Sequence, residues 1–309
     1  MRKLLSAIIT ASILALFGVF IVRNWDVMQE AIAQVQYASL PVAIGAVLLV
    51  GVGVSLAAFA YQQLALRPLP YHELFIIENA AILGSRLLPA GVGGMGVHGV
   101  YLHRRHHSAT QASAVVLANN SLGFIVHVLL LLACCLLVPS SIRELQLGER
   151  LPQRWVFAGL VISSVLVLAI PPLRRRAKRL VGELFAAYRH YTQNPKKVAL
   201  AALSLALVTC TNVFILWLAC REVAPAIVTD FAATTMLVVY SAGVFFGALL
   251  PTPGGLVGVE AGLVAALATY GVDVKTAITC TLLFRLATYW FPLLPGLAGL
   301  ILARQYKLL

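Results

Sequence analysis

The sequence predicts an all-α polytopic membrane protein with about six full spans and two broken or re-entrant helical hairpins, arranged as an inverted-topology repeat with both termini in the cytoplasm. Of its 309 residues, 61% are hydrophobic and only 11% are charged, whereas roughly a quarter of the residues of a soluble domain are charged. The formal net charge is +12, and the basic residues cluster in loops beside apolar runs, as the positive-inside rule describes. We therefore expect membrane lipids as partners and no nucleic acid.

Two similar proline- and glycine-rich stretches, 87–99 and 249–262, interrupt apolar sequence in the two halves of the chain. Each contains Leu-Leu-Pro, then Gly-Gly, then Gly-Val followed by His98 or Glu260. Proline removes a backbone donor and glycine tolerates unusual dihedral angles. Non-helical backbone at membrane depth is tolerated only where protein covers it or where it lines a wet cavity. Each stretch therefore predicts a broken hairpin.

The hairpin arms are expected at 73–88 and 93–107 in the first half, and at 230–250 and 256–270 in the second. Charge counting does not distinguish re-entrant arms from arms that cross the bilayer fully, and 230–250 is long enough to cross. Full spans are expected at 4–22, 40–62, 110–138, 154–172, 198–220 and 276–303. The first run resembles a signal peptide, but it exceeds the ~7–15 residues typical of a signal core, so we predict an uncleaved span.

A single membrane domain, 1–309, is divided accordingly into four parts. Residues 1–39 hold the first span and an outside loop at 23–39, and residues 40–138 form the first repeat. Residues 139–197 hold a linking span and a basic cytoplasmic segment at 173–197, and residues 198–309 form the second repeat. Within the basic segment, apolar residues from 180 to 188 recur with helical spacing. This pattern predicts either an amphipathic helix on the anionic leaflet or a plain positive-inside loop.

Six ionisable residues lie in the apolar segments: Glu78, Arg86, His98, His127, Glu260 and Arg285. A lone charge at the bilayer centre costs at least ~2.5 kcal/mol, so these groups should face a cavity or one another. Arginine binds phosphate with two parallel hydrogen bonds, and helix N-termini near the two Gly-Gly pairs would also favour an anion. The candidate site for a phosphate-bearing headgroup comprises Arg285, Glu260, Arg86, Glu78, Gly254, Gly255, Gly93, Gly94, Asn119 and Asn120.

Each charged or polar candidate also has a purely structural interpretation. Glu260 and Arg285 could form an ion pair that only locks the second hairpin, and Arg86 could extend to a membrane interface. Glu78 could pair with Arg86 two helical turns away. His127 would then be a core histidine, and Asn119 and Asn120 would hydrogen-bond between helices.

The sequence gives little support for a metal site, a bound cofactor or a catalytic site. His103, His106 and His107 share a helical turn, but no carboxylate accompanies them, so we expect no metal site. The five cysteines have no metal-ligand spacing and are interpreted as small core residues. No intramembrane aspartate pair, Walker A loop or nucleophile elbow occurs, so we expect no cofactor and no catalytic site.

Several segments together are similar to one family: Val92-Gly-Gly-Met-Gly96, Asn119-Asn-Ser-Leu-Gly123, Leu250-Pro-Thr-Pro-Gly-Gly-Leu-Val-Gly-Val-Glu260, Phe284-Arg285 and Thr288-Tyr-Trp-Phe-Pro292. They resemble the flippase-like membrane family grouped with the transmembrane region of lysylphosphatidylglycerol synthases. The resemblance implies a bacterial plasma-membrane flippase for an aminoacylated or other lipid, with Glu260 and Arg285 as site residues. Because the chain lacks the soluble aminoacyltransferase domain of the synthases, we expect no synthase activity.

The function predicted is therefore translocation of an anionic, aminoacylated or phosphate-bearing lipid between leaflets. Arg285, with Arg86, would hold the phosphate, and Glu260 would orient Arg285 or meet a cationic headgroup. Two alternatives stay open. One is a non-transporting scaffold or regulator that binds a lipid-modifying enzyme through 173–197, and the other is an ion-coupled solute transporter in which Glu260 titrates.

Overall fold

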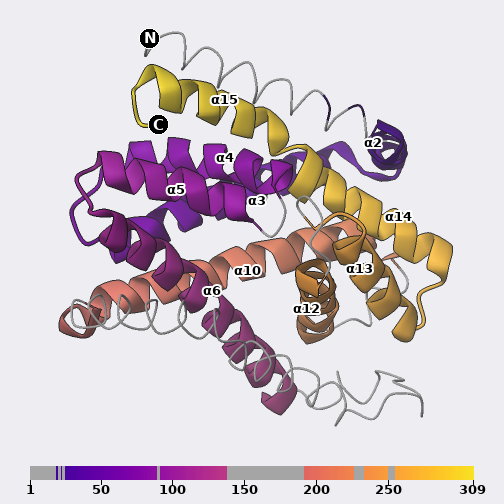
Figure 1. The fold of residues 1–309 in the computed structure, drawn as a ribbon. Coiled ribbons are helices and arrows are strands. Elements are labelled where there is room, and N and C mark those ends of the chain that lie inside the picture. Colours follow the sequence, from indigo (N-terminus) through magenta and orange to yellow (C-terminus); the bar gives the residue numbers. More distant parts are fainter. Residues whose placement is uncertain are drawn as a thin grey trace, which may run out of the picture.

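The computed structural model describes Val19, Val22 and residues 25–88, 91–137, 191–225, 233–249 and 255–309. Within these ranges the regular secondary structure is helical (Figure 1). The elements are α2 (Trp25–Ala33), η1 (Gln34–Tyr37), α3 (Leu40–Leu64), α4 (Tyr71–Leu87), α5 (Val92–Arg104), α6 (Ala109–Leu137), α10 (Pro195–Val223), α12 (Ala233–Leu249), α13 (Gly258–Thr269), α14 (Val274–Arg285), η2 (Leu286–Trp290) and α15 (Leu293–Gln305).

Four of these helical segments are long and apolar enough to cross a membrane, so the chain is a multi-pass membrane protein. They are α3, α6, α10 and the run from α14 to α15, so helices long enough to span are present where spans were predicted at 40–62, 110–138, 198–220 and 276–303. Helices α3 and α10 each have a proline in the first turn, Pro41 and Pro195, which suits a turn whose N–H groups have no intrahelical partner. The spans predicted at 4–22 and 154–172, and the amphipathic pattern at 180–188, lie outside the described residues.

Two pairs of shorter helices follow the predicted breaks. Helices α4 and α5 have 17 and 13 residues, and α12 and α13 have 17 and 12. At 1.5 Å per residue they are about 18 to 26 Å long, whereas the hydrocarbon core is about 30 Å thick. Each pair therefore forms a hairpin of arms that are short for a span. The part of the second break at 250–254 lies outside the described residues.

Glycine lets the two arms of each hairpin touch backbone to backbone. A Cβ on Gly93 of α5 would lie 2.0 Å from the carbonyl oxygen of Gly84 in α4. In the second hairpin, a Cβ on Gly258 would lie 2.6 Å from the carbonyl oxygen of Phe246. Small residues are the usual means of close helix packing in membranes, and here a single methyl group would not fit.

The sequence suggested that the last span is one uninterrupted helix. The structure shows that it is interrupted. Helix α14 ends at Arg285, and the π-helical turn η2 follows, in which the Phe291 N–H donates to the Leu286 carbonyl oxygen at 2.9 Å. Pro292 comes next and has no N–H for the Thr288 carbonyl four residues earlier. The helix therefore changes its winding here and leaves the Thr288 carbonyl free for another donor. Single π-turns within helices often occur at functional sites.

Residues 23–39 were predicted as a loop, but the described part of this stretch forms α2 and η1. The prediction rested on Asp26, Glu30 and nearby polar residues. No proline or glycine occurs between Trp25 and Tyr37, so nothing in the backbone stops a helix. The reading of every cysteine as a core residue also needs correction, because Cys210 is exposed.

The two halves meet around a small apolar cluster. Leu83 of α4 packs there with Leu256, Tyr289, Trp290 and Leu293. In Figure 1, α4 and α5 lie beside α3 and α15, while α12 and α13 lie beside α14 and one end of α10. The cluster lies between these two groups and positions the site described below.

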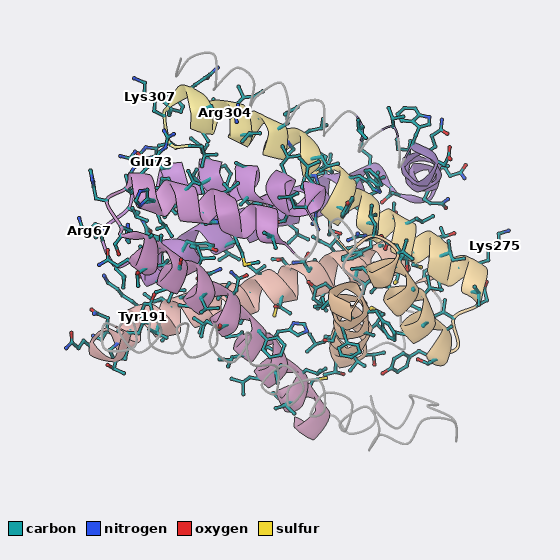
Figure 2. The ribbon with its side chains drawn as sticks, viewed as in Figure 1. Arg67, Glu73, Tyr191, Lys275, Arg304 and Lys307 are labelled. Atoms are coloured by element: carbon teal, nitrogen blue, oxygen red, sulfur yellow. The ribbon has the colours of Figure 1, made fainter. Side chains whose placement is uncertain are left out.

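Charged side chains mark the ends of the helices. Figure 2 shows Arg67, Glu73, Arg304 and Lys307 at one end of the assembly and Lys275 at the opposite end. Loops carrying charge at both ends are expected where the apolar middle of each helix lies in lipid.

Candidate functional site

Glu260 and Arg285 form a buried ion pair between α13 and α14. The Arg285 Nε donates to the Glu260 Oε1 at 2.6 Å, and the Arg285 side chain is 5% exposed. Glu260 lies in the first turn of α13, which starts within the second proline- and glycine-rich stretch. A charge-assisted hydrogen bond of this length matches one positive charge with one negative charge inside the helices.

Arg86 reaches the same place from α4. Its Nη2 donates to the Thr288 carbonyl oxygen at 3.1 Å, the oxygen that Pro292 leaves without an intrahelical donor. Its guanidinium lies over the Tyr289 ring, 4.6 Å from the ring centroid, and the guanidinium of Arg285 lies 4.2 Å from the same centroid. Arg86 therefore points into the helix assembly rather than extending to an interface. The negative face of a buried aromatic ring attracts both cations.

A cavity of about 450 Å³ opens beside this pair of arginines. It is lined by Ser85, Arg86, Gly91, Asn212, Tyr240, Val244, Gly247, Ala248, Gly255, Val259, Phe284, Arg285 and Thr288. Gly255, a predicted site residue, lies in its wall with a φ of +71°. Gly254 lies outside the described residues. The cavity thus combines two guanidinium groups with mostly apolar walls, as binding pockets for small amphipathic molecules commonly do.

A second cavity, of about 200 Å³, shares part of this lining. Arg86, Asn212 and Thr288 line both cavities, and Glu78 lines the smaller one. Arg86 therefore stands at the boundary between the two.

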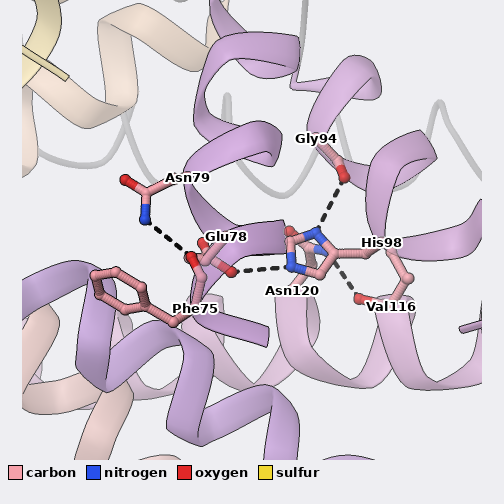
Figure 3. Close-up of polar contacts among 7 residues, drawn as sticks. All are labelled: Phe75, Glu78, Asn79, Gly94, His98, Val116 and Asn120. Carbon is pink, nitrogen blue, oxygen red and sulfur yellow. Dashed lines mark hydrogen bonds and ion pairs between the residues drawn. The ribbon is translucent and has the colours of Figure 1, made fainter. Parts of the chain in front are cut away.

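Glu78 pairs with His98, so the predicted pairing with Arg86 is wrong. The His98 Nε2 lies 2.9 Å from the Glu78 Oε2, and its Nδ1 lies 3.0 Å from the Gly94 carbonyl oxygen (Figure 3). The imidazole is 3% exposed and stacks on the ring of Tyr61, with a centroid distance of 3.8 Å. The reason lies in the hairpin: the contact between α4 and α5 brings His98 opposite Glu78, whereas the eight residues from Glu78 to Arg86 span about 12 Å.

Both ring nitrogens of His98 face oxygen atoms. An imidazolium would donate to both oxygens, and a neutral imidazole with its proton on Nδ1 would accept a hydrogen bond at Nε2 from a protonated carboxyl group. In each arrangement the Glu78 carboxyl group is hydrogen-bonded to His98 rather than to Arg86.

The remaining predicted residues lie away from the arginine cavity. Gly93 and Gly94 lie in the first turn of α5 and pack against α4, so this helix N-terminus is covered by the other arm of the hairpin. Asn119 and Asn120 lie beside the Tyr61 hydroxyl, and the Asn120 amide donates to the Val116 carbonyl oxygen at 2.7 Å (Figure 3). They belong with the Glu78–His98 pair.

His127 is not arranged as part of a binding site. The ring of His127 contacts the edge of the Tyr240 ring, with centroids 5.9 Å apart, which fits a core histidine. Within the described ranges, no group of three or more His, Cys, Asp or Glu side chains is placed to hold a metal ion.

Sequence reasoning missed Tyr289, Thr288 and Asn212 as parts of the site. A signal for Thr288 was present, because a proline in an otherwise helical run frees the carbonyl four residues before it. Asn212 was visible as a polar residue in an apolar span. Tyr289 carried no signal of its own, since an aromatic residue in a membrane helix usually packs in the core.

Comparison with known proteins agrees with this architecture. Residues 4–296 match the family model described as "Lysylphosphatidylglycerol synthase TM region". The match includes both hairpins, α3, α6, α10 and both arginines of the site, and it ends within α15. A search of curated proteins found no match.

Proposed function

Because the chain belongs to the lysylphosphatidylglycerol synthase transmembrane-region family, we propose that it is a lipid translocase of a bacterial plasma membrane. It moves an anionic, aminoacylated or other phosphate-bearing lipid between leaflets, and its role is transport rather than lipid synthesis. The observation that carries this proposal is the 450 Å³ cavity in which Arg86 and Arg285 both lie against Tyr289. A membrane-embedded cavity with two guanidinium groups suits a lipid phosphate.

An apolar groove next to the cavity supports a ligand with acyl chains. The groove, of about 500 Å³, is lined by Leu130, Cys210, Val213, Phe214, Trp217, Ala233, Thr234, Met236 and Leu237. Helices α10 and α12 contribute to both spaces: Asn212 and Tyr240 face the cavity, while Val213 and Leu237 face the groove. A phospholipid has the same division into a polar head and apolar chains.

The two hairpins provide the route in this proposal. Arms shorter than a full span fit re-entrant helices, and two such hairpins in the two halves fit an inverted repeat that binds its substrate near the bilayer midplane. The end of the assembly with Arg67, Arg304 and Lys307 would face the cytoplasm, and Lys275 would face outside.

Scrambling of fluorescent phosphatidylglycerol in liposomes tests the proposal. The purified full-length protein should move the lipid between leaflets, and Arg285→Ala should abolish that movement while the protein still inserts. Lys275→Ala removes a charge from the other, exposed end of the same helix and should leave the rate unchanged. Because Arg285→Ala leaves Glu260 unpaired, the double variant Glu260→Ala, Arg285→Ala controls for misfolding and should also be inactive.

A scaffold for a lipid-modifying enzyme would behave in the opposite way. Neutralising the basic residues of 174–179 should then abolish function in cells, and changes at Arg285 should be tolerated. Normal lipid movement by a stably inserted Arg285→Ala protein would refute the site assignment.

A further inference from the structure

Arg86 and Arg285 differ in the charge of the groups that accept their hydrogen bonds. Arg285 donates to the carboxylate of Glu260, whereas the Arg86 Nη2 donates to a neutral backbone carbonyl. The Arg86 Nε is buried and has no hydrogen-bond partner. The ion pairs found among the described residues join Glu78 to His98, Glu73 to Arg105 and Glu260 to Arg285, so none of them includes Arg86.

Among the residues that the structure describes, the charges around Tyr289 leave Arg86 without a carboxylate partner. Arg86 and Arg285 contribute two positive charges, and Glu260 contributes one negative charge. Glu78 lines the smaller cavity with Arg86, but its carboxyl group is hydrogen-bonded to His98. An unmatched charge inside a protein is costly, and a single aromatic face compensates only part of that cost. The described part of the site therefore has one positive charge more than it has carboxylates facing it.

We infer that Arg86 is the principal ligand for a monoanionic phosphodiester, and that the site selects headgroups of net negative charge over zwitterionic and cationic ones. This inference rests on the proposed function and, among the lipids named there, favours those of net negative charge over aminoacylated ones. Arg86 lines the cavity, and the planar guanidinium fork matches two phosphate oxygens. A phosphodiester carries one negative charge and brings the cluster to neutrality.

Two features of the site bear on this assignment. Arg86, Asn212 and Thr288 line both cavities, so a phosphate that passes from one cavity to the other stays within reach of the same guanidinium. The Oε2 of Glu260 also lacks a hydrogen-bond donor and could accept one from an ammonium group. Its charge is already matched by Arg285, however, and a net-cationic headgroup would add to the existing surplus of positive charge.

Binding of short-chain ligands to the full-length protein in an uncharged detergent tests the inference. The probes are dihexanoyl phosphatidylglycerol, dihexanoyl phosphatidylcholine, water-soluble glycerophosphoglycerol and inorganic phosphate, and titration calorimetry gives each Kd. Phosphatidylglycerol should bind at least about tenfold more tightly than phosphatidylcholine. Arg86→Gln should weaken phosphatidylglycerol binding by about 10- to 100-fold, as expected for charged hydrogen bonds, and should remove the preference.

Arg221→Gln is the matched control. Arg221 also lies over an aromatic ring, with its guanidinium carbon 5.1 Å from the centroid of Trp217, but it is exposed at the end of α10. This variant makes the same change in net charge and should leave both affinities within about twofold of wild type. Equal affinity of the wild type for the two lipids, or unchanged phosphatidylglycerol binding by Arg86→Gln, would overturn the inference.

A second variant and the soluble probes complete the test. If Arg86→Gln does not fold, Arg86→Lys carries the test: it should keep the preference for phosphatidylglycerol with weaker binding, and loss of the preference would overturn the inference. Glycerophosphoglycerol that binds as tightly as the lipid, in an Arg86-dependent way, would support the phosphodiester assignment and identify a water-soluble source.

The outcomes also separate this inference from the proposed function. Arg86-dependent binding without lipid scrambling would contradict translocation alone. Scrambling of both lipids at equal rates, unaffected by Arg86→Gln, would contradict the role of Arg86 alone.

Discussion

Replacing Gly93 by alanine should separate the arms of the first hairpin. The new Cβ would lie 2.0 Å from the Gly84 carbonyl oxygen and 2.4 Å from its carbon. A carbon and a carbonyl oxygen approach normally to about 3.3 Å, so α4 and α5 would have to move apart by about 1.3 Å. Both atoms belong to backbone, which no rotamer change can move aside. We expect a loss of stability of at least about 1–3 kcal/mol, the usual cost of overpacking.

Gly96→Ala in the same helix provides the control. A Cβ there would have no neighbour within 4 Å, and alanine is more favourable than glycine in a helix interior by roughly 0.5–1 kcal/mol. The same substitution at two positions three residues apart should therefore change the stability of the protein in opposite directions. Unfolding by sodium dodecyl sulfate, followed by tryptophan fluorescence, measures both. If Gly93→Ala were as stable as Gly96→Ala, the backbone contact between the arms would be refuted.

The same separation should reach the polar pair of the first half. Glu78 lies on α4 and His98 on α5, and their side chains are 2.9 Å apart. An increase of about 1.3 Å from the contact distance above would take them beyond hydrogen-bond range. We therefore expect Gly93→Ala, and not Gly96→Ala, to lower lipid movement in the liposome assay.

Three further predictions concern the second half. Glu260→Gln should cost about 3–5 kcal/mol in detergent unfolding, because it removes the carboxylate that matches the buried charge of Arg285; the double change Glu260→Gln, Arg285→Gln should cost less, and an equal or larger loss would contradict the pairing. Tyr289→Leu removes the ring under both guanidinium groups, each contact being worth about 0.5–2 kcal/mol, and should weaken short-chain phosphatidylglycerol binding, whereas Tyr289→Phe keeps the ring and should bind normally. Asp273 caps α14 by accepting from the Thr276 N–H at 3.1 Å, and hydrogen bonding to Thr276 lowers the pKa of Asp273 below its ordinary 3.8. The stability that the Asp273 carboxylate contributes is thus present above pH 3.8 and is lost as the pH falls through the lowered pKa. Asp273→Asn still caps the helix but does not titrate, so it should reduce the fall of the melting temperature below about pH 4. An unchanged fall would exclude the carboxylate as the cause of this pH dependence.

The elements that could be predicted from the sequence are those with strong local causes. Long runs of Val, Leu and Ala can only be buried or face lipid, so the long apolar helices at 40–62, 110–138, 198–220 and 276–303 could be predicted. Proline and glycine act on their own backbone, so the hairpin breaks were also predictable. The approach of Arg86 to Arg285 was anticipated only in outline, from the cost of leaving a charge alone among apolar residues.

Features that depend on how helices cross could not be predicted in the same way. Whether Glu78 meets Arg86 or His98 depends on the contact between α4 and α5, and a single sequence does not contain that geometry. The turn η2 was missed because Leu286–Trp290 has no glycine or proline of its own, while Pro292 would also suit the first turn of a new helix. The helix α2 was missed because polar residues were taken as a loop signal, although backbone breakers define helix ends more strongly.

The backbone contacts have a mechanical consequence. Besides the contacts within each hairpin, a Cβ on Gly299 of α15 would lie 2.9 Å from the Ile76 carbonyl oxygen of α4, so α4, α5 and α15 are locked into one stiff body. Helices α12 and α13 form another. Helix α14 leads toward the second body, and the chain passes from α14 through η2 into α15. A π-turn interrupts the regular helical hydrogen bonds, so it should bend more easily than the helices on either side. We expect bending to concentrate at η2, which contains Tyr289 and directly follows Arg285. A change in the angle between the two bodies would therefore change the contacts that these residues make with a bound phosphate.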